Sequence, residues 1–79
     1  MKKNIKKYKA IVIDCKGLLL PDKRMQGSYA IQWIGYDDID RVVFESEVII
    51  FEGEFSPVMT FSLTNEKGFI LGTQEIQFL

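Results

Sequence analysis

Apolar and polar side chains alternate in short runs along most of this chain, and that period of two restricts the fold to β-strands. In residues 28–34, Tyr29, Ile31 and Trp33 occupy every second position, which would place them on one face of a strand. No window carries a sustained apolar stripe with the 3.6-residue period of a helix. The chain is therefore predicted to be all-β.

Glycine, proline, asparagine and aspartate separate these runs and predict where the chain turns. The strongest hairpin signal is residues 64–68, with Asn65 at the turn entrance and Gly68 where a positive φ is needed. The other predicted features are a polar loop at 21–27, a bulge or bend at Gly17, a helical turn near 36–41, a hairpin link at 45–47 and a tight turn at 52–54. The expected strands cover residues 8–15, 28–34, 39–44, 47–51, 58–63, and 69–71 followed by 75–79.

Strands at this spacing predict a single small antiparallel sheet or barrel of about five to seven strands, with at most one short helical turn. A chain of 79 residues has room for one domain, residues 1–79, in which residues 1–7 form a flexible lysine-rich tail. The core residues expected from the alternation are Ile11, Ile13, Leu19, Ile31, Trp33, Ile39, Val43, Ile49, Phe51, Phe61, Leu63 and Ile70.

The residue content argues against most catalytic chemistry. The chain has no histidine and a single cysteine, Cys15, so a thiolate nucleophile would lack the base that usually activates it. The carboxylates of Asp37, Asp38 and Asp40 fall in a turn signal without EF-hand spacing, and we interpret them as a solvated turn. We therefore expect a protein that is not an enzyme, with no catalytic residues, no metal and no cofactor.

The cysteine content and the apolar runs bear on the compartment. One cysteine cannot close an intramolecular disulfide, so the chain lacks the disulfide bonds that stabilise small secreted domains. The lysine-rich start precedes a short apolar run in the order of a signal peptide, but Asp14 and Lys16 interrupt that run too early. No run approaches the roughly 20 apolar residues of a membrane span. We expect a cytoplasmic protein without membrane contact.

A net charge of −1 conceals a strong division of charge along the chain. Residues 1–24 carry eight basic and two acidic side chains, whereas residues 25–79 carry two basic and nine acidic ones. An asymmetry of this kind points to an electrostatic partner or to docking between copies.

The aromatic content supplies the first functional hypothesis. A domain of this size buries only about 60% of its unfolded surface, so some apolar area is left over for a partner. We expect a binding or regulatory module that acts by protein–protein interaction through an acidic and aromatic surface. The candidate residues of this surface are Trp33, Tyr36, Asp37, Asp38 and Phe78.

The alternative hypothesis is a small β-barrel that binds nucleic acid through the N-terminal segment. Lysines there can hold phosphates, and an interleaved tyrosine can stack on a base. The acidic remainder of the chain would repel the same phosphates, which makes this the second choice. The candidate contacts are Lys2, Lys3, Lys6, Lys7, Tyr8 and Lys9.

Residues 31–43, which read Ile-Gln-Trp-Ile-Gly-Tyr-Asp-Asp-Ile-Asp-Arg-Val-Val, carry a local resemblance. The passage resembles the strand–Tyr-x-Asp-Ile-x-x-Val–strand segment of bacterial pleckstrin-homology-like domains, with Gly35 where proline is more usual. Residues 75–79 are too short for the C-terminal helix that closes such barrels. The resemblance implies an SH3-like or PH-like barrel used for binding, and it implies no catalytic residues.

The C-terminal segment bears on self-association. Residues 74–79 are β-prone, and the only charged side chain near Phe78 is Glu75. An edge strand there would expose N–H and C=O groups to another chain. We predict a homodimer that makes contact through residues 74–79 or through the face that carries Trp33.

Overall fold

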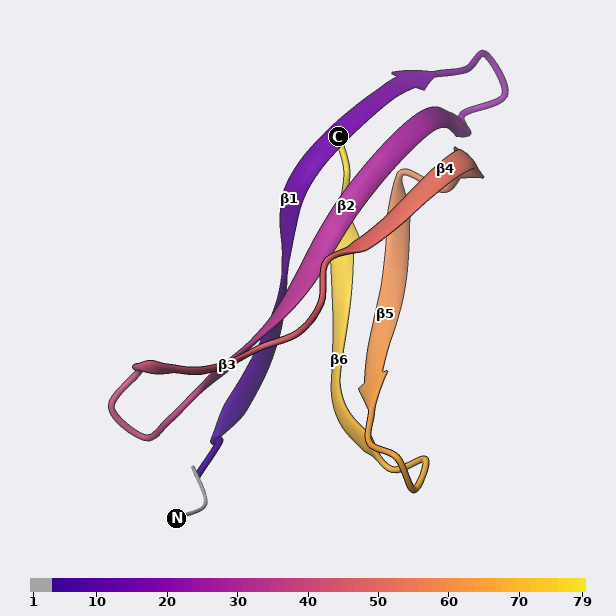
Figure 1. Ribbon diagram of the computed structural model, residues 1–79. Coiled ribbons are helices and arrows are strands. Elements are labelled where there is room, and N and C mark those ends of the chain that lie inside the picture. The colour runs from indigo at the N-terminus through magenta and orange to yellow at the C-terminus, as the bar shows by residue number, and fades with distance from the viewer. Residues whose placement is uncertain (1–3) are drawn as a thin grey trace.

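The computed structural model describes residues 4–79, and this part of the chain is all-β (Figure 1). It forms six antiparallel strands in two sheets, and no helix occurs within these residues. The predicted all-β antiparallel class is therefore confirmed. The larger sheet contains β1 (Lys7–Leu19), β2 (Met25–Tyr36), β3 (Val42–Glu45) and β4 (Ile49–Phe55), and the smaller one is the hairpin of β5 (Val58–Thr64) and β6 (Ile70–Gln77).

Strand β2 is the centre of the larger sheet. It pairs with β1 along one edge, while β4 and β3 follow one another along its other edge. The predicted hairpin at 45–47 is therefore wrong, because β3 and β4 both pair with β2 and not with each other. Ser46 holds the link to β2: its N–H donates to the Trp33 carbonyl at 2.9 Å, and its hydroxyl accepts from the Trp33 N–H at 2.9 Å.

A row of three glycines crosses the larger sheet, since Gly17, Gly27 and Gly53 are neighbours on β1, β2 and β4. The tight turn predicted at 52–54 is wrong, because Gly53 lies inside β4 opposite Gly27. Gly27 has a φ of 151°, and a Cβ added to it would lie 1.9 Å from the Lys16 carbonyl oxygen. Only glycine fits where β1 and β2 approach this closely.

The hairpin packs across one face of the larger sheet, and the core lies between them (Figure 1). The Tyr29 ring is at its centre, with ring centroids 4.8 Å from Phe78, 5.0 Å from Phe55 and 5.7 Å from Phe61. Offset and edge-to-face aromatic contacts of this kind add to the stabilisation that burial provides. The buried hydrophobic cluster comprises Ala10, Met25, Tyr29, Ile31, Trp33, Phe55 and Ile76.

The predicted core is only partly confirmed. Ile31 and Trp33 are buried, and Val43, Phe61 and Leu63 are half-buried. The hairpin covers one face of the larger sheet and leaves the other to solvent, so residues outside the covered area stay exposed. The predicted core residues that are exposed are Ile11, Ile13, Leu19, Ile39, Ile49, Phe51 and Ile70.

In two turns, a side-chain oxygen accepts hydrogen bonds from backbone N–H groups in the same pattern. In the predicted hairpin turn, Asn65 Oδ1 accepts from the N–H groups of Lys67 and Phe69, and Gly68 has a φ of 87°, so this prediction is confirmed. In the turn after β2, Asp37 Oδ1 accepts from the N–H groups of Ile39 and Arg41 at the same spacing. The expected helical turn near 36–41 is thus a turn built on an aspartate side chain.

Three other local predictions are refined. The irregularity in β1 falls between Val12 and Asp14, and Gly17 pairs regularly with Gly27. Residues 70–77 form one continuous strand. In the predicted tail, residues 1–3 lie outside the described part, the Lys6 N–H donates to the Tyr36 carbonyl, and β1 begins at residue 7.

Candidate interaction surface

The five predicted partner residues do not form one surface. Trp33 is 1% exposed and belongs to the core, so its ring cannot reach a partner. Phe78 is half-buried against the rings of Tyr29 and Phe55. Where β2 ends, Tyr36 is half-buried and Asp38 is exposed.

Asp37 in this segment has a structural role. Its side chain is buried, and it binds the N–H of Arg41 at 2.9 Å and the Arg41 guanidinium at 2.8 Å. The Arg41 N–H lowers the pKa of Asp37 most; the Arg41 guanidinium and the Ile39 N–H lower it further, against the opposing effect of burial. The exposed neighbour is Asp38.

The residues proposed to contact nucleic acid do not share one face of β1. Alternation places Lys7 and Lys9 on one face of β1 and Tyr8 on the other, so Tyr8 is not interleaved with them on a common surface. Tyr8 is half-buried, with its ring centroid 5.7 Å from that of Phe44. Lys6 is exposed, and Lys2 and Lys3 lie outside the described residues.

Lys7 is already engaged within the chain. Its Nζ lies 3.0 Å from Asp40 Oδ1 and 5.5 Å from the centroid of the Tyr36 ring. A phosphate would have to compete with both contacts for this lysine.

The C-terminal segment predicted to pair with another chain is paired within the chain along one edge. Along one side of β6, Gln77 faces Val58 of β5, and the Phe78 N–H donates to the Pro57 carbonyl at 2.8 Å. On the other side, the Gln74 side chain binds Ala10 of β1. One edge of β6 is therefore closed by β5, while its other edge pairs with no strand, so the predicted contact through residues 74–79 stays a prediction; Trp33 is too deeply buried to supply the alternative contact.

The side of the larger sheet opposite the hairpin is its most exposed broad surface. We call it the outer face. Every second residue of β2 from Gln26 to Tyr36 lies on this face, with the cross-strand partners of these residues on β1, β3 and β4; among them Ile34 is buried, at 6% exposure.

The exposed lysines of the outer face lie on β1 and its exposed glutamates on β3 and β4, while Asp14 is an exposed acid on β1. Lys9 and Lys16 are exposed on β1, whereas Glu45 on β3 and Glu52 on β4 are exposed along the opposite edge. The part of β2 between these edges carries no charged residue. Apart from Asp14, the outer face therefore has a basic edge on β1 and an acidic edge on β3 and β4, with a neutral strand between them.

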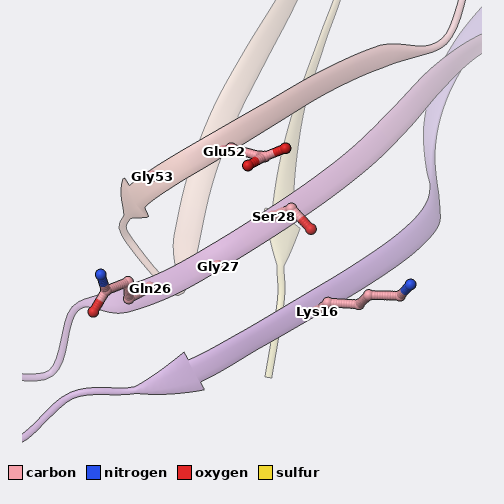
Figure 2. Close-up of a pocket in the computed structure, with 6 residues that line it drawn as sticks. All are labelled: Lys16, Gln26, Gly27, Ser28, Glu52 and Gly53. Atoms are coloured by element: carbon pink, nitrogen blue, oxygen red, sulfur yellow. The ribbon is translucent and has the colours of Figure 1, made fainter.

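The register aligns these charges in two rows. Lys9, Ile34 and Glu45 are cross-strand neighbours in one row, and Lys16, Ser28 and Glu52 are neighbours in the other. Figure 2 shows the second row, with Lys16, Ser28 and Glu52 on three adjacent strands. Each row thus has a lysine at one end and a glutamate at the other.

Apolar side chains occupy the space between the two charged rows. Ile50 is 71% exposed and lies beside Ala30, and Ile11 is 39% exposed on the other side of β2. Asp14 shares the row of Ala30 and Ile50, and its carboxylate lies 3.9 Å from Lys16 Nζ. Ile50 and Ile11 thus leave apolar area exposed between the charged rows.

A hollow of about 420 Å³ opens beside the second row (Figure 2). Its lining is polar side chains and the backbone of two glycines, and it lies on an open sheet face. It offers hydrogen-bonding groups to an approaching surface. The lining residues are Lys16, Gln26, Gly27, Ser28, Glu52 and Gly53.

A second hollow of about 520 Å³ lies between the hairpin turn and the larger sheet. The Tyr8 and Phe44 rings, in edge-to-face contact, line it together with Leu63 and Leu71, and Glu66 and Lys67 contribute from the turn. This hollow is the more apolar of the two and could accept a single apolar side chain.

Comparisons with models of protein families, with curated proteins and with solved structures found no match to this chain. The resemblance of residues 31–43 to pleckstrin-homology-like domains therefore stays a prediction. No helix in residues 4–79 is long and apolar enough to cross a membrane. Over the same residues, His, Cys, Asp and Glu side chains form no group of three or more that could hold a metal ion.

Sequence reasoning missed the outer face because its residues are far apart in the chain. Lys16, Ser28 and Glu52 become neighbours only through the pairing of three strands. The alternation within each strand was visible, but assembling the face also requires the register between strands.

Proposed function

We propose that this protein is a non-enzymatic binding module whose interaction surface, for a protein partner, is the outer face. The observation that carries the proposal is the exposed apolar side chain of Ile50, which lies on β4 between the two charged rows. Interfaces between proteins combine an apolar centre with a polar rim, and the outer face has this layout. Its open, shallow shape suits a broad partner better than a small enclosed ligand.

A protein partner is favoured over nucleic acid by the charge layout. Glu45 and Glu52 lie on the same face as Lys9 and Lys16, so a phosphate backbone that meets the lysines also meets the carboxylates. A protein surface can present both signs of charge in the matching arrangement.

Site-specific photocrosslinking in cells tests this proposal. A benzoylphenylalanine is placed at Ile50 on the outer face and, as the matched control, at Thr60, an exposed position in β5 on the hairpin. We expect discrete protein adducts from position 50 and few or none from position 60. Equal adduct patterns, or no protein adducts from position 50, would contradict the proposal.

The nucleic-acid alternative has its own measurement. Fluorescence anisotropy with single-stranded DNA and RNA probes is recorded at about 50 mM and about 200 mM salt. A protein making about six phosphate contacts would lose roughly a thousandfold in affinity over this range. We expect no binding at either salt concentration, and a steep salt-dependent affinity would favour the alternative.

A further inference from the structure

We propose that the outer face binds a second copy of this chain, in a face-to-face homodimer whose two-fold axis runs parallel to β2. The inference rests on the proposed function, because it names the partner of that same surface. It differs from the contacts expected from the sequence, of which the Trp33 face is buried and residues 74–77 are paired with β5 along one edge.

The two charged rows are complementary to a second copy of themselves. Rotation by 180° about an axis parallel to β2 places each row of one copy opposite the same row of the second copy, with the two ends of the row exchanged. Lys16 of one copy then faces Glu52 of the other, and the symmetry makes this contact twice. The same operation places Lys9 opposite Glu45, again twice. Every exposed charge named in the two rows therefore meets the opposite sign.

The other face-to-face arrangement is disfavoured by the same charges. An axis that crosses the strands would lay β1 on β1 with the rows reversed. Lys16 would then face Lys9 of the second copy, and Glu52 would face Glu45. Like charges opposite each other weaken an interface, so the charge layout selects the axis parallel to β2.

The row between the two charged rows has a small residue at its centre. Ala30 lies on the central strand, near the axis, and would approach its own copy, while Ile50 on β4 would lie opposite Asp14 on β1 of the second copy. Stacked sheets lie about 10 Å apart, and a small residue near the axis lets them come that close. The lysine and glutamate side chains are long enough to meet across this spacing at the two edges.

The arrangement also explains why Ile50 is exposed in the single chain. Covering an isoleucine that is 71% exposed removes apolar area from water, which provides the driving force. The charged rows contribute less to affinity, but they set the orientation.

The test is sedimentation velocity on the full chain at about 5 µM and about 100 µM, with charge-reversed variants. The variants are Lys16→Glu, Glu52→Lys and the double variant that carries both changes. The matched control is Glu75→Lys, an exposed glutamate on the hairpin. Circular dichroism on every variant establishes that the sheet is intact.

We expect the wild-type protein of 9.1 kDa to shift toward twice that mass as the concentration rises. Each single reversal creates two repulsive contacts in the dimer and should weaken dimerisation about tenfold or more. The double reversal restores opposite charges and should return the affinity to within about threefold of wild type. The Glu75→Lys control should dimerise like the wild type.

Three results would overturn the inference. A wild-type monomer at both concentrations excludes the dimer, while adducts from position 50 to other proteins would leave the proposed function standing. Dimers that respond alike to Glu52→Lys and Glu75→Lys place the contact elsewhere. A stronger dimer with Lys16→Glu alone would show the axis that crosses the strands.

Discussion

The side-chain amide of Gln74 makes to Ala10 the two hydrogen bonds that a neighbouring strand would make. The Ala10 N–H donates to Gln74 Oε1 at 2.9 Å, and Gln74 Nε2 donates to the Ala10 carbonyl at 2.7 Å. Ala10 is 3% exposed, so without Gln74 both backbone groups would lose their partner inside the protein. One side chain thus ties the hairpin to the edge of the larger sheet.

Replacing Gln74 by methionine should therefore destabilise the protein. The substitution keeps a side chain of similar length but removes both bonds, which costs about 1–3 kcal/mol for a buried group left without a partner. Gln77→Met, at an exposed position of the same strand, is the matched control and should change stability by less than about 0.5 kcal/mol. Urea denaturation measures the free energy of unfolding of both variants. Equal losses of stability in the two variants would show that the bonds between Gln74 and Ala10 contribute nothing.

The glycine row predicts a contrast between two alanine substitutions. Gly27→Ala should prevent folding or lower the melting temperature severely, because the new Cβ would meet the Lys16 carbonyl oxygen, which cannot move away. Gly68→Ala in the hairpin turn meets no atom within 4 Å, so only its positive φ opposes it, at about 1–2 kcal/mol. Thermal unfolding compares the two. A Gly27→Ala protein at least as stable as Gly68→Ala would contradict this account of the close approach between β1 and β2.

Two isoleucines in adjacent strands should respond differently to truncation. Ile31 is fully buried, so Ile31→Ala should cost about 2–5 kcal/mol of unfolding free energy. Ile50 is 71% exposed, so Ile50→Ala should cost the monomer less than about 0.5 kcal/mol while weakening self-association. Denaturation at low concentration separates these effects. Similar losses at the two sites would mean that the assignment of faces is wrong.

Protonation of Asp37 is expected to contribute to unfolding of the protein in acid. Its pKa in the folded chain lies below the ordinary value of 3.8, so the carboxylate stabilises the fold fully above the pKa of the unfolded chain. That contribution is lost as the pH falls below about 4 and through the lower folded pKa. Asp37→Asn should lower the melting temperature at pH 7, and its difference from wild type should shrink toward pH 2. A difference that is constant from pH 7 to pH 2 would contradict this role. The exposed neighbour supplies the control, since Asp38→Asn should have little effect at pH 7.

The local parts of this fold were predictable from sequence because their causes are local. Period-two alternation marked the strand that contains Tyr29, Ile31 and Trp33. The hairpin turn was predicted because Asn65 and Gly68 each meet a requirement of the turn itself.

The predictions that were wrong concern features that depend on strand pairing. Gly53 was predicted to lie in a turn, since glycine usually marks one, but its position is explained by Gly27 on the neighbouring strand. The outer face was missed for the same reason: Lys16 and Glu52 are 36 positions apart in the sequence and share a row only through β2. Trp33 was expected both in the core and on the partner surface, and burial at 1% exposure places it in the core.

The most direct test of the outer face as a self-binding surface is the concentration dependence of amide chemical shifts in ¹H–¹⁵N spectra. Dilution from about 500 µM to about 10 µM should shift the amides of Lys9, Lys16, Ala30, Ile50 and Glu52. Over the same range, Thr60 and Thr73 on the hairpin should keep their positions. Shifts confined to the hairpin, or no shift anywhere over this range, would contradict the account.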